Sequence, residues 1–142
     1  MKKIFVLLVF SASVIACNNT TTAEGEETEV QAENKVDALK AEVMVLHDKT
    51  MPKMNEMGQL TSKLKAAVAE AQDSSAYFNA INDLTQAKES MMDWMHSFQN
   101  PDEMEATEEE KIDYLKSERA KMADIADYTD RSIEKAKEVL AK

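Results

Sequence analysis

The sequence of 142 residues has few of the residues that shape turns and only one cysteine. It contains two glycines and two prolines, whereas Ala, Glu, Lys, Leu and Met, which favour helices, are common. This scarcity of turn formers argues against a strand-rich fold. The single cysteine, Cys17, excludes a disulfide bond within the chain. The sequence therefore predicts one all-α domain.

Basic side chains are also scarce relative to acidic ones. The chain has 17 Lys and Arg residues against 27 Asp and Glu residues, a formal charge of −10. Removing the residues before Cys17 would take away Lys2 and Lys3 but no acid, and would change this charge to −12. Such a surface repels phosphate groups, so we expect no nucleic-acid partner.

The N-terminus has the features of an export signal. Two lysines precede an apolar stretch, residues 4–15, whose 12 residues are too few to cross a bilayer core; about 20 are needed. The boundary Ser13-Val14-Ile15-Ala16-Cys17 resembles a lipobox, the sequence at which a bacterial lipoprotein is cleaved before a diacylated cysteine. We predict a cleaved signal peptide over 1–16 and lipidation of Cys17. The alternative is an ordinary signal peptide followed by a free cysteine.

Lipidation would hold the chain on a membrane without any apolar protein surface. Each buried methylene contributes about 0.8 kcal/mol, so two or three acyl chains such as palmitate form a lasting anchor. Residues 17–29 are polar and acidic, which predicts a flexible tether. Asn18 after the cysteine resembles lipoproteins that are not retained at the inner membrane. We expect a place in the cell envelope, with the outer membrane favoured and the membrane face left open.

From residue 30 onward, apolar residues recur at helical spacing. We predict a helical bundle over 30–142, with helices at about 30–72, 75–98 and 107–141. Pro52 is expected to kink the first helix near His47 and Asp48. Short connections favour an antiparallel up-down-up three-helix bundle with coiled-coil-like packing. A hairpin of long helices that dimerises is the alternative.

Two local patterns refine this prediction. Lys88 falls on the apolar stripe of the second helix, so we expect Ala87 to take the inner position while Lys88 extends to solvent. Thr107 followed by Glu110 matches the capping-box pattern and predicts the start of the third helix.

Methionine is unusually frequent, with nine of the ten methionines after Cys17. Most form two groups, each with a histidine, which a hairpin of the first two helices would bring to one level. Thioether and imidazole groups together suit Cu(I), and Trp94 could shield the ion by a cation–π contact. The candidate metal ligands are His47, Met51, Met54, Met92, Met95 and His96.

The same methionines have two simpler interpretations. Methionine is an adaptable core residue, and a stripe at helical spacing is typical of a packed core. In the second interpretation, the methionines line a groove that receives a partner helix. The sequence leaves the three open, and apart from Cu(I) no cofactor is expected.

No arrangement of residues predicts catalysis. Asp93 and His96 are spaced to touch on a helix, but no nucleophile accompanies them. His47 and Asp48 are neighbours on a helix and are expected to point apart. We therefore expect a protein that is not an enzyme.

The segments 47–54 (HDKTMPKM) and 91–95 (MMDWM) resemble a group of small lipoproteins from Bacteroidetes-type bacteria. The likeness covers roughly the whole helical region. Members are often labelled "viral A-type inclusion protein", a name that reflects coiled-coil similarity. The resemblance implies a helical lipoprotein but no activity. We expect a non-enzymatic envelope protein that acts through helix contacts, with itself or with an envelope partner, and a Cu(I)-binding lipoprotein as the alternative.

Overall fold

A computed structural model describes residues 23–142, with side chains for 31, 32 and 34–142. The predicted signal peptide, Cys17 and the tether before Ala23 lie outside the described residues. The elements are α1 (Ala23–Thr50), α2 (Lys53–Val68), α3 (Ser75–Ser97), the 3-10 turn η1 (Pro101–Glu103) and α4 (Glu108–Leu140). Strands are absent from this part of the chain. The predicted all-α fold, with three helical lengths packed together, is confirmed.

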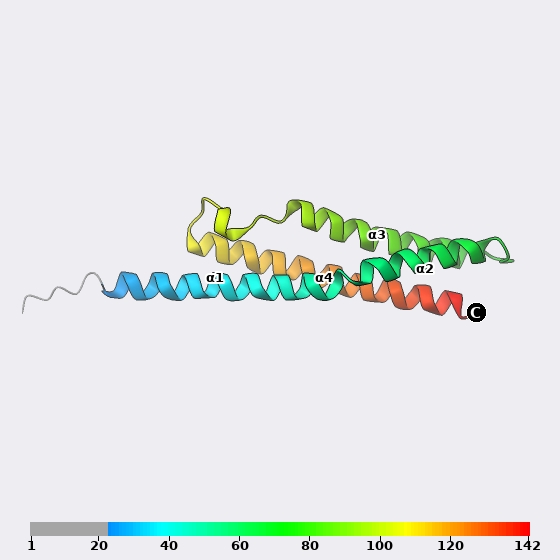
Figure 1. The fold of residues 1–142 in the computed structure, drawn as a ribbon, viewed down its shortest axis with the longest axis horizontal. Coiled ribbons are helices and arrows are strands. Elements are labelled where there is room, and N and C mark those ends of the chain that lie inside the picture. Colours follow the sequence, from blue (N-terminus) through cyan, green and yellow to red (C-terminus); the bar gives the residue numbers. More distant parts are fainter. Residues whose placement is uncertain (1–22) are drawn as a thin grey trace, which may run out of the picture.

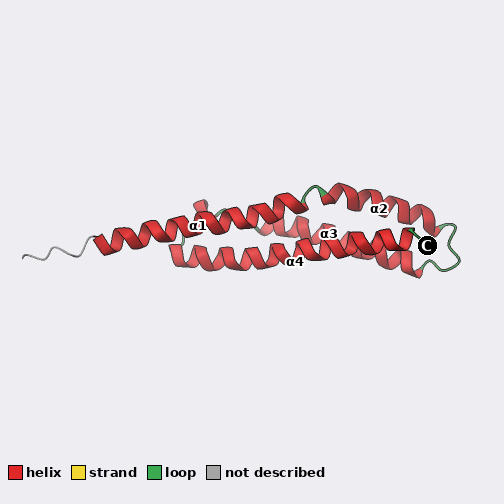
Figure 2. Ribbon diagram, turned by 90° about the horizontal axis from the view of Figure 1, so that it is seen from below, coloured by secondary structure: helices red, strands yellow, loops and turns green. Residues whose placement is uncertain are grey.

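The helices form a long rod (Figure 1). The chain runs along the rod through α1 and α2, returns through α3 and turns again into α4. The C-terminus consequently lies near the turn between α2 and α3. The view in Figure 2 shows α4 running beside both α1 and α2, while the start of α1 extends beyond the other helices.

The first helical length is interrupted at Met51 and Pro52, where a turn separates α1 from α2. Proline has no N–H to donate, and its ring disfavours helical backbone at the preceding residue. The continuous helix over 30–72, with a kink near His47 and Asp48, is therefore corrected to two helices with the break at Met51–Pro52. The backbone N–H of Met51 still donates to the carbonyl of His47, at 2.8 Å.

The helix limits agree with the sequence at some ends and differ at others. α1 begins at Ala23 and so includes residues 23–29, which were assigned to the tether. This segment is rich in glutamate, and acidic residues stabilise the first turns of a helix. α3 and α4 begin and end within one residue of the prediction. The capping box is confirmed: Thr107 Oγ1 accepts from the N–H of Glu110, whose carboxylate accepts from the N–H of Thr107 at 2.8 Å.

The core has two parts along the rod. One, which we call the α2 half-core, joins α2, the first part of α3 and the end of α4; its buried residues are Met57, Leu60, Leu64, Ala80, Leu84, Ala87, Ile133, Ala136 and Val139. The other, the α1 half-core, joins α1, the end of α3 and the first part of α4; its buried residues are Val36, Leu39, Val43, Met91, Trp94, Ile112, Leu115 and Met122. Met54 packs against both. As predicted, Ala87 is buried and Lys88 is exposed.

Exposed ion pairs join α4 to α1 and to α2. Arg119 contacts Glu42 at 2.6 Å, and Lys137 contacts Glu56 at 2.7 Å. Such pairs each contribute only about 0–1 kcal/mol. These pairs show how α4 is aligned along α1 and α2, but they add little to the stability of the rod.

In the described part of the chain, every helix is too short or too polar to span a lipid bilayer.

Candidate functional site

The six predicted metal ligands fall into different surroundings. Met51, Met54 and Met95 are half-buried and pack against the α1 half-core. Met92 is exposed and belongs to neither half-core, and His96 is exposed at the end of α3. The structure thus brings the three half-buried methionines to the α1 half-core and leaves Met92 and His96 outside it.

His47, the remaining candidate, packs against Trp94, with the two ring centroids 5.6 Å apart. Its Nδ1 lies 2.9 Å from the carboxylate of Asp48. The expectation that these neighbours point apart was therefore wrong. The Asp48 side chain is largely exposed, so it is free to turn toward the imidazole ring. Within residues 23–142, no group of three or more His, Cys, Asp or Glu side chains is arranged to hold a metal ion.

A buried carboxylate, which the sequence analysis missed, lies in the α1 half-core. The Glu118 residue is 3% exposed, and its Oε2 accepts a hydrogen bond from Trp94 Nε1 at 2.9 Å. Its Oε1 accepts from Lys121 Nζ at 2.7 Å. This hydrogen bond and the carboxylate charge raise the pKa of the exposed Lys121 ammonium. Burying a carboxylate is costly unless it is paired and hydrogen-bonded, and both conditions are met here.

A signal for this pairing was present in the sequence. Glu118 follows Leu115 by three positions and precedes Met122 by four, so it occupies the same helix face as these buried residues. A carboxylate on an apolar face requires a donor, and Trp94 is the only tryptophan of the chain. The pair links α3 to α4 and could be found by matching the buried acceptor to the available donor.

A row of aromatic rings continues from Trp94 toward the loop between α3 and α4. The centroids of Trp94 and Phe98 are 4.9 Å apart, and those of Phe98 and Tyr114 are 6.1 Å apart. Tyr114 Oη accepts from the backbone N–H of Gln99 at 2.7 Å, which ties the end of α3 to α4. Burial raises the pKa of the Tyr114 hydroxyl, against the opposing effect of this hydrogen bond.

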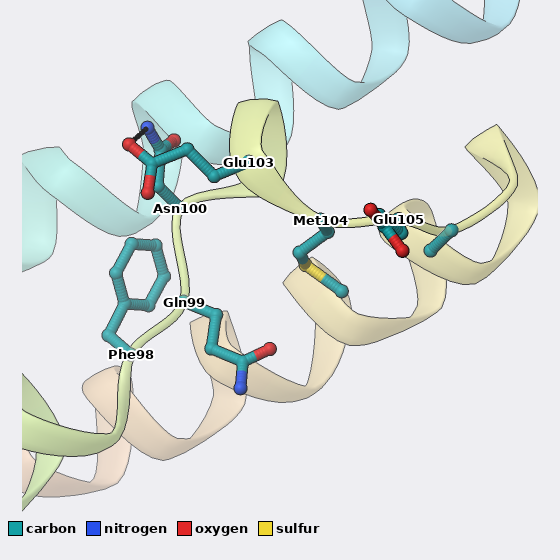
Figure 3. A pocket seen from close by; sticks show the side chains of 7 residues that line it. Phe98, Gln99, Asn100, Glu103, Met104 and Glu105 are labelled. Carbon is teal, nitrogen blue, oxygen red and sulfur yellow. Dashed lines mark hydrogen bonds between the residues drawn. The ribbon is translucent and has the colours of Figure 1, made fainter.

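Phe98, the middle ring of this row, also lines a loop pocket of about 540 Å³ (Figure 3). Its lining combines the Phe98 ring with polar side chains and one thioether, from residues Phe98, Gln99, Asn100, Glu103, Met104, Glu105 and Ala106. Asn100 Nδ2 donates to Glu103 Oε1 at 3.4 Å, the dashed contact in Figure 3. Asn100 also caps η1 by accepting from the N–H of Asp102. Some polar groups of the loop therefore form hydrogen bonds within the loop itself.

Two grooves follow the helix boundaries. The α1–α4 groove, about 450 Å³, is lined by Ala38, Ala41, Glu42, Val45, Leu46 and Arg119. The α2–α3 groove, about 390 Å³, is lined by Met57, Gly58, Thr61, Leu84, Thr85, Lys88, Glu89, Met92 and Asp93. Each groove has apolar groups within a charged rim, so each could receive an apolar side chain of another molecule.

No family model matches the chain, and neither the curated proteins nor the solved structures include a significant match. Function is therefore argued from the residues and their placement.

Proposed function

We propose that this protein is a lipid-anchored component of the bacterial cell envelope whose helical domain acts by contact with other proteins and without catalysis. The charged start, the apolar stretch and the lipobox-like boundary at Cys17 support the anchor. The resemblance of residues 47–54 and 91–95 to small Bacteroidetes-type lipoproteins supports the same assignment. The outer membrane is the favoured location.

The observation that carries the contact function is the α1–α4 groove. Ala38, Ala41 and Val45 follow one another at positions that share a helix face, and all three are exposed. Val45 is 49% exposed and, with Phe78 and Met92, is one of three exposed large apolar residues among the described side chains. Alanines allow another helix to approach closely, while the neighbouring valine offers apolar area. This face therefore suits a partner helix.

We propose in addition that the rod is an up-down-up bundle with coiled-coil-like packing. The path of the chain in Figure 1 supports this arrangement. The ion pairs of Glu42 with Arg119 and of Glu56 with Lys137 are in keeping with α4 running parallel to α1 and α2. The hydrogen bond of Trp94 with Glu118 and the ion pair of Asp83 with Lys135 fit an antiparallel pairing of α3 with α4.

The anchor is tested by labelling cells with radioactive palmitate and fractionating them. We expect the wild-type chain to carry the label and to remain with the membranes, and Cys17→Ser to lose the label. Separating inner from outer membranes gives the location. An unlabelled wild-type chain, or equal labelling of Cys17→Ser, would contradict the anchor.

The contact function is tested by photo-crosslinking the full chain in its own membranes. A photoreactive residue at position 45 should give a discrete protein adduct, and the same residue at the exposed position 117 of α4 should not. Ala41→Glu should weaken the adduct, whereas Ser117→Glu should leave it unchanged. The mass of the adduct distinguishes a second copy from another envelope protein. Equal adducts from both positions, or none, would overturn the proposal.

Cu(I) binding is a second candidate, and one observation favours it. Met51, Met54 and Met95 all pack against the α1 half-core, so thioethers from both methionine groups reach one cluster. A Cu(I) titration against a competing chelator tests this. Wild type should bind more tightly than micromolar, and Met51→Leu/Met54→Leu should lose this affinity. Weaker binding by wild type, or an unchanged affinity in the double variant, would exclude the candidate.

A further inference from the structure

Two adjacent methionines in α3 have opposite surroundings. Met91 is 0% exposed in the α1 half-core, whereas Met92 is 39% exposed. Met92 is the only methionine among the residues with described side chains that is exposed rather than buried or half-buried. Oxidation of methionine depends on access to its sulfur atom. The pair therefore offers a reactive thioether beside a protected one on the same helix turn.

The α2–α3 groove gives small molecules a path to this thioether. Met92 lines the groove together with Met57 and Leu84. On the α2 side of the groove Gly58 has no side chain, and a Cβ added there would meet open space. The volume of about 390 Å³ admits molecules much larger than water. A peroxide, which is only slightly larger than water, can therefore approach the sulfur atom from the groove.

The fold can accept an added oxygen atom at Met92. This residue is 39% exposed and belongs to neither half-core, so a sulfoxide oxygen there can face solvent. Lys88 precedes Met92 by one helix turn and lines the same groove, so α3 carries a hydrogen-bond donor on the same side as a sulfoxide at Met92. By contrast, Met57, Met91 and Met122 are buried, and a sulfoxide at any of them would bury an unpaired polar group.

We propose that Met92 is an oxidation site at which the protein consumes hydrogen peroxide or another small hydroperoxide without losing its fold. A lone pair of the Met92 sulfur attacks one peroxide oxygen, an S–O bond forms and the O–O bond breaks. With hydrogen peroxide, the proton on the transferred oxygen passes to the departing hydroxide, which leaves as water. Sulfur loses two electrons and the peroxide gains them. The product is the sulfoxide of Met92, with the adjacent Met91 unchanged.

The test treats the full chain with increasing hydrogen peroxide and locates added oxygen by peptide mass mapping. Met92 should gain oxygen at least about tenfold faster than Met91, since reactivity follows access. Met92→Leu should abolish the first addition, while Met104→Leu, a half-buried methionine of the loop pocket, should not change it. Circular dichroism should show the same helix content and melting temperature after the first addition.

Three results would overturn the proposal. The first is oxidation of a half-buried methionine, such as Met44 or Met104, as fast as Met92. The second is an undiminished first addition in Met92→Leu. The third is a fall in melting temperature when Met92 alone is oxidised, because this would show that the fold depends on the unmodified thioether. None of these measurements requires a partner protein or a metal.

Discussion

The buried side chains of the α2 half-core are all non-aromatic and uncharged, whereas the α1 half-core includes Trp94 and lies beside the buried carboxylate of Glu118. An aliphatic core is stabilised by burial and close packing, neither of which depends strongly on direction. A hydrogen bond from an indole N–H to a carboxylate requires one alignment of two helices. The difference suggests that the α2 half-core supplies stability and that the α1 half-core also fixes the position of α3 against α4.

The largest expected effect is a cavity in either half-core. Leu84→Ala, in the α2 half-core, and Leu115→Ala, in the α1 half-core, should each lower the free energy of unfolding by about 2–5 kcal/mol. Both side chains are buried almost completely, at 1% and 0% exposure. Urea unfolding followed by circular dichroism measures the change. Similar losses would show that both half-cores belong to one cooperative unit, whereas two separate transitions would divide the rod into independent parts.

The next effect concerns the polar contact that distinguishes the α1 half-core. Glu118→Ala should lower the free energy of unfolding by about 1–3 kcal/mol, because Trp94 Nε1–H would remain buried without its acceptor. Glu118→Gln keeps a carbonyl oxygen and should cost less. The same urea titration measures both variants.

A double-mutant cycle with Trp94→Phe controls this prediction. Phenylalanine has no N–H to leave unpaired, so Glu118→Ala should cost less in that background than in wild type. A coupling of at least about 0.5 kcal/mol is expected for two residues in direct contact. Strictly additive losses would mean that the contact does not distinguish the two half-cores energetically.

A smaller effect is expected at the start of α4, the helix whose first part contributes buried residues to the α1 half-core. Thr107→Ala removes a capping hydroxyl and should cost about 1 kcal/mol at neutral pH. The hydrogen bonds from the backbone and side chain of Thr107 lower the pKa of Glu110 below its ordinary value of 4.5. A carboxyl group with a lowered folded-state pKa stabilises the fold above its unfolded pKa, and this stabilisation is lost as pH falls through the folded value.

Acid titration of stability tests the capping box directly. Wild type should lose stability as pH falls below about 4.5, and Thr107→Ala should show a shallower loss over that range, because Glu110 then lacks one of its two partners. Ser117→Ala, at an exposed position of the same helix, serves as the control and should keep the wild-type slope. Identical slopes for Thr107→Ala and wild type would contradict the role of the box.

The sequence predicted the features that depend on local rules. Apolar spacing located the helices, and the Thr107 pattern located the start of α4. The sequence also predicted a kink near His47 and Asp48, because the missing N–H of Pro52 leaves the carbonyl one helix turn earlier without its donor. The break instead lies at Met51, because the proline ring restricts the residue before it.

The candidate sites could be predicted only in part, because they depend on contacts between distant residues. Helical spacing brought Met51 and Met54 toward one cluster, but it could not show that Met92 turns to a groove while Met91 enters the core. The apolar face of α4 shows that Glu118 needs a donor, but the sequence of α4 alone does not show how α3 is turned to supply Trp94. Such pairings follow from the relative rotation of packed helices, which the apolar stripe determines only coarsely.

The smallest effect tests whether buried polar groups help only when they are paired. Thr129 in α4 is 0% exposed, and its Oγ1 has no hydrogen-bond partner among the described residues. Thr129→Val keeps the shape and removes the hydroxyl, so it should raise the free energy of unfolding by about 1 kcal/mol or less. Ser132 Oγ donates to the carbonyl of Tyr128 at 2.8 Å, so Ser132→Ala should not be stabilising. If Thr129→Val instead destabilises the protein, the hydroxyl has a partner such as a buried water, and the contrast between paired and unpaired polar groups fails at this position.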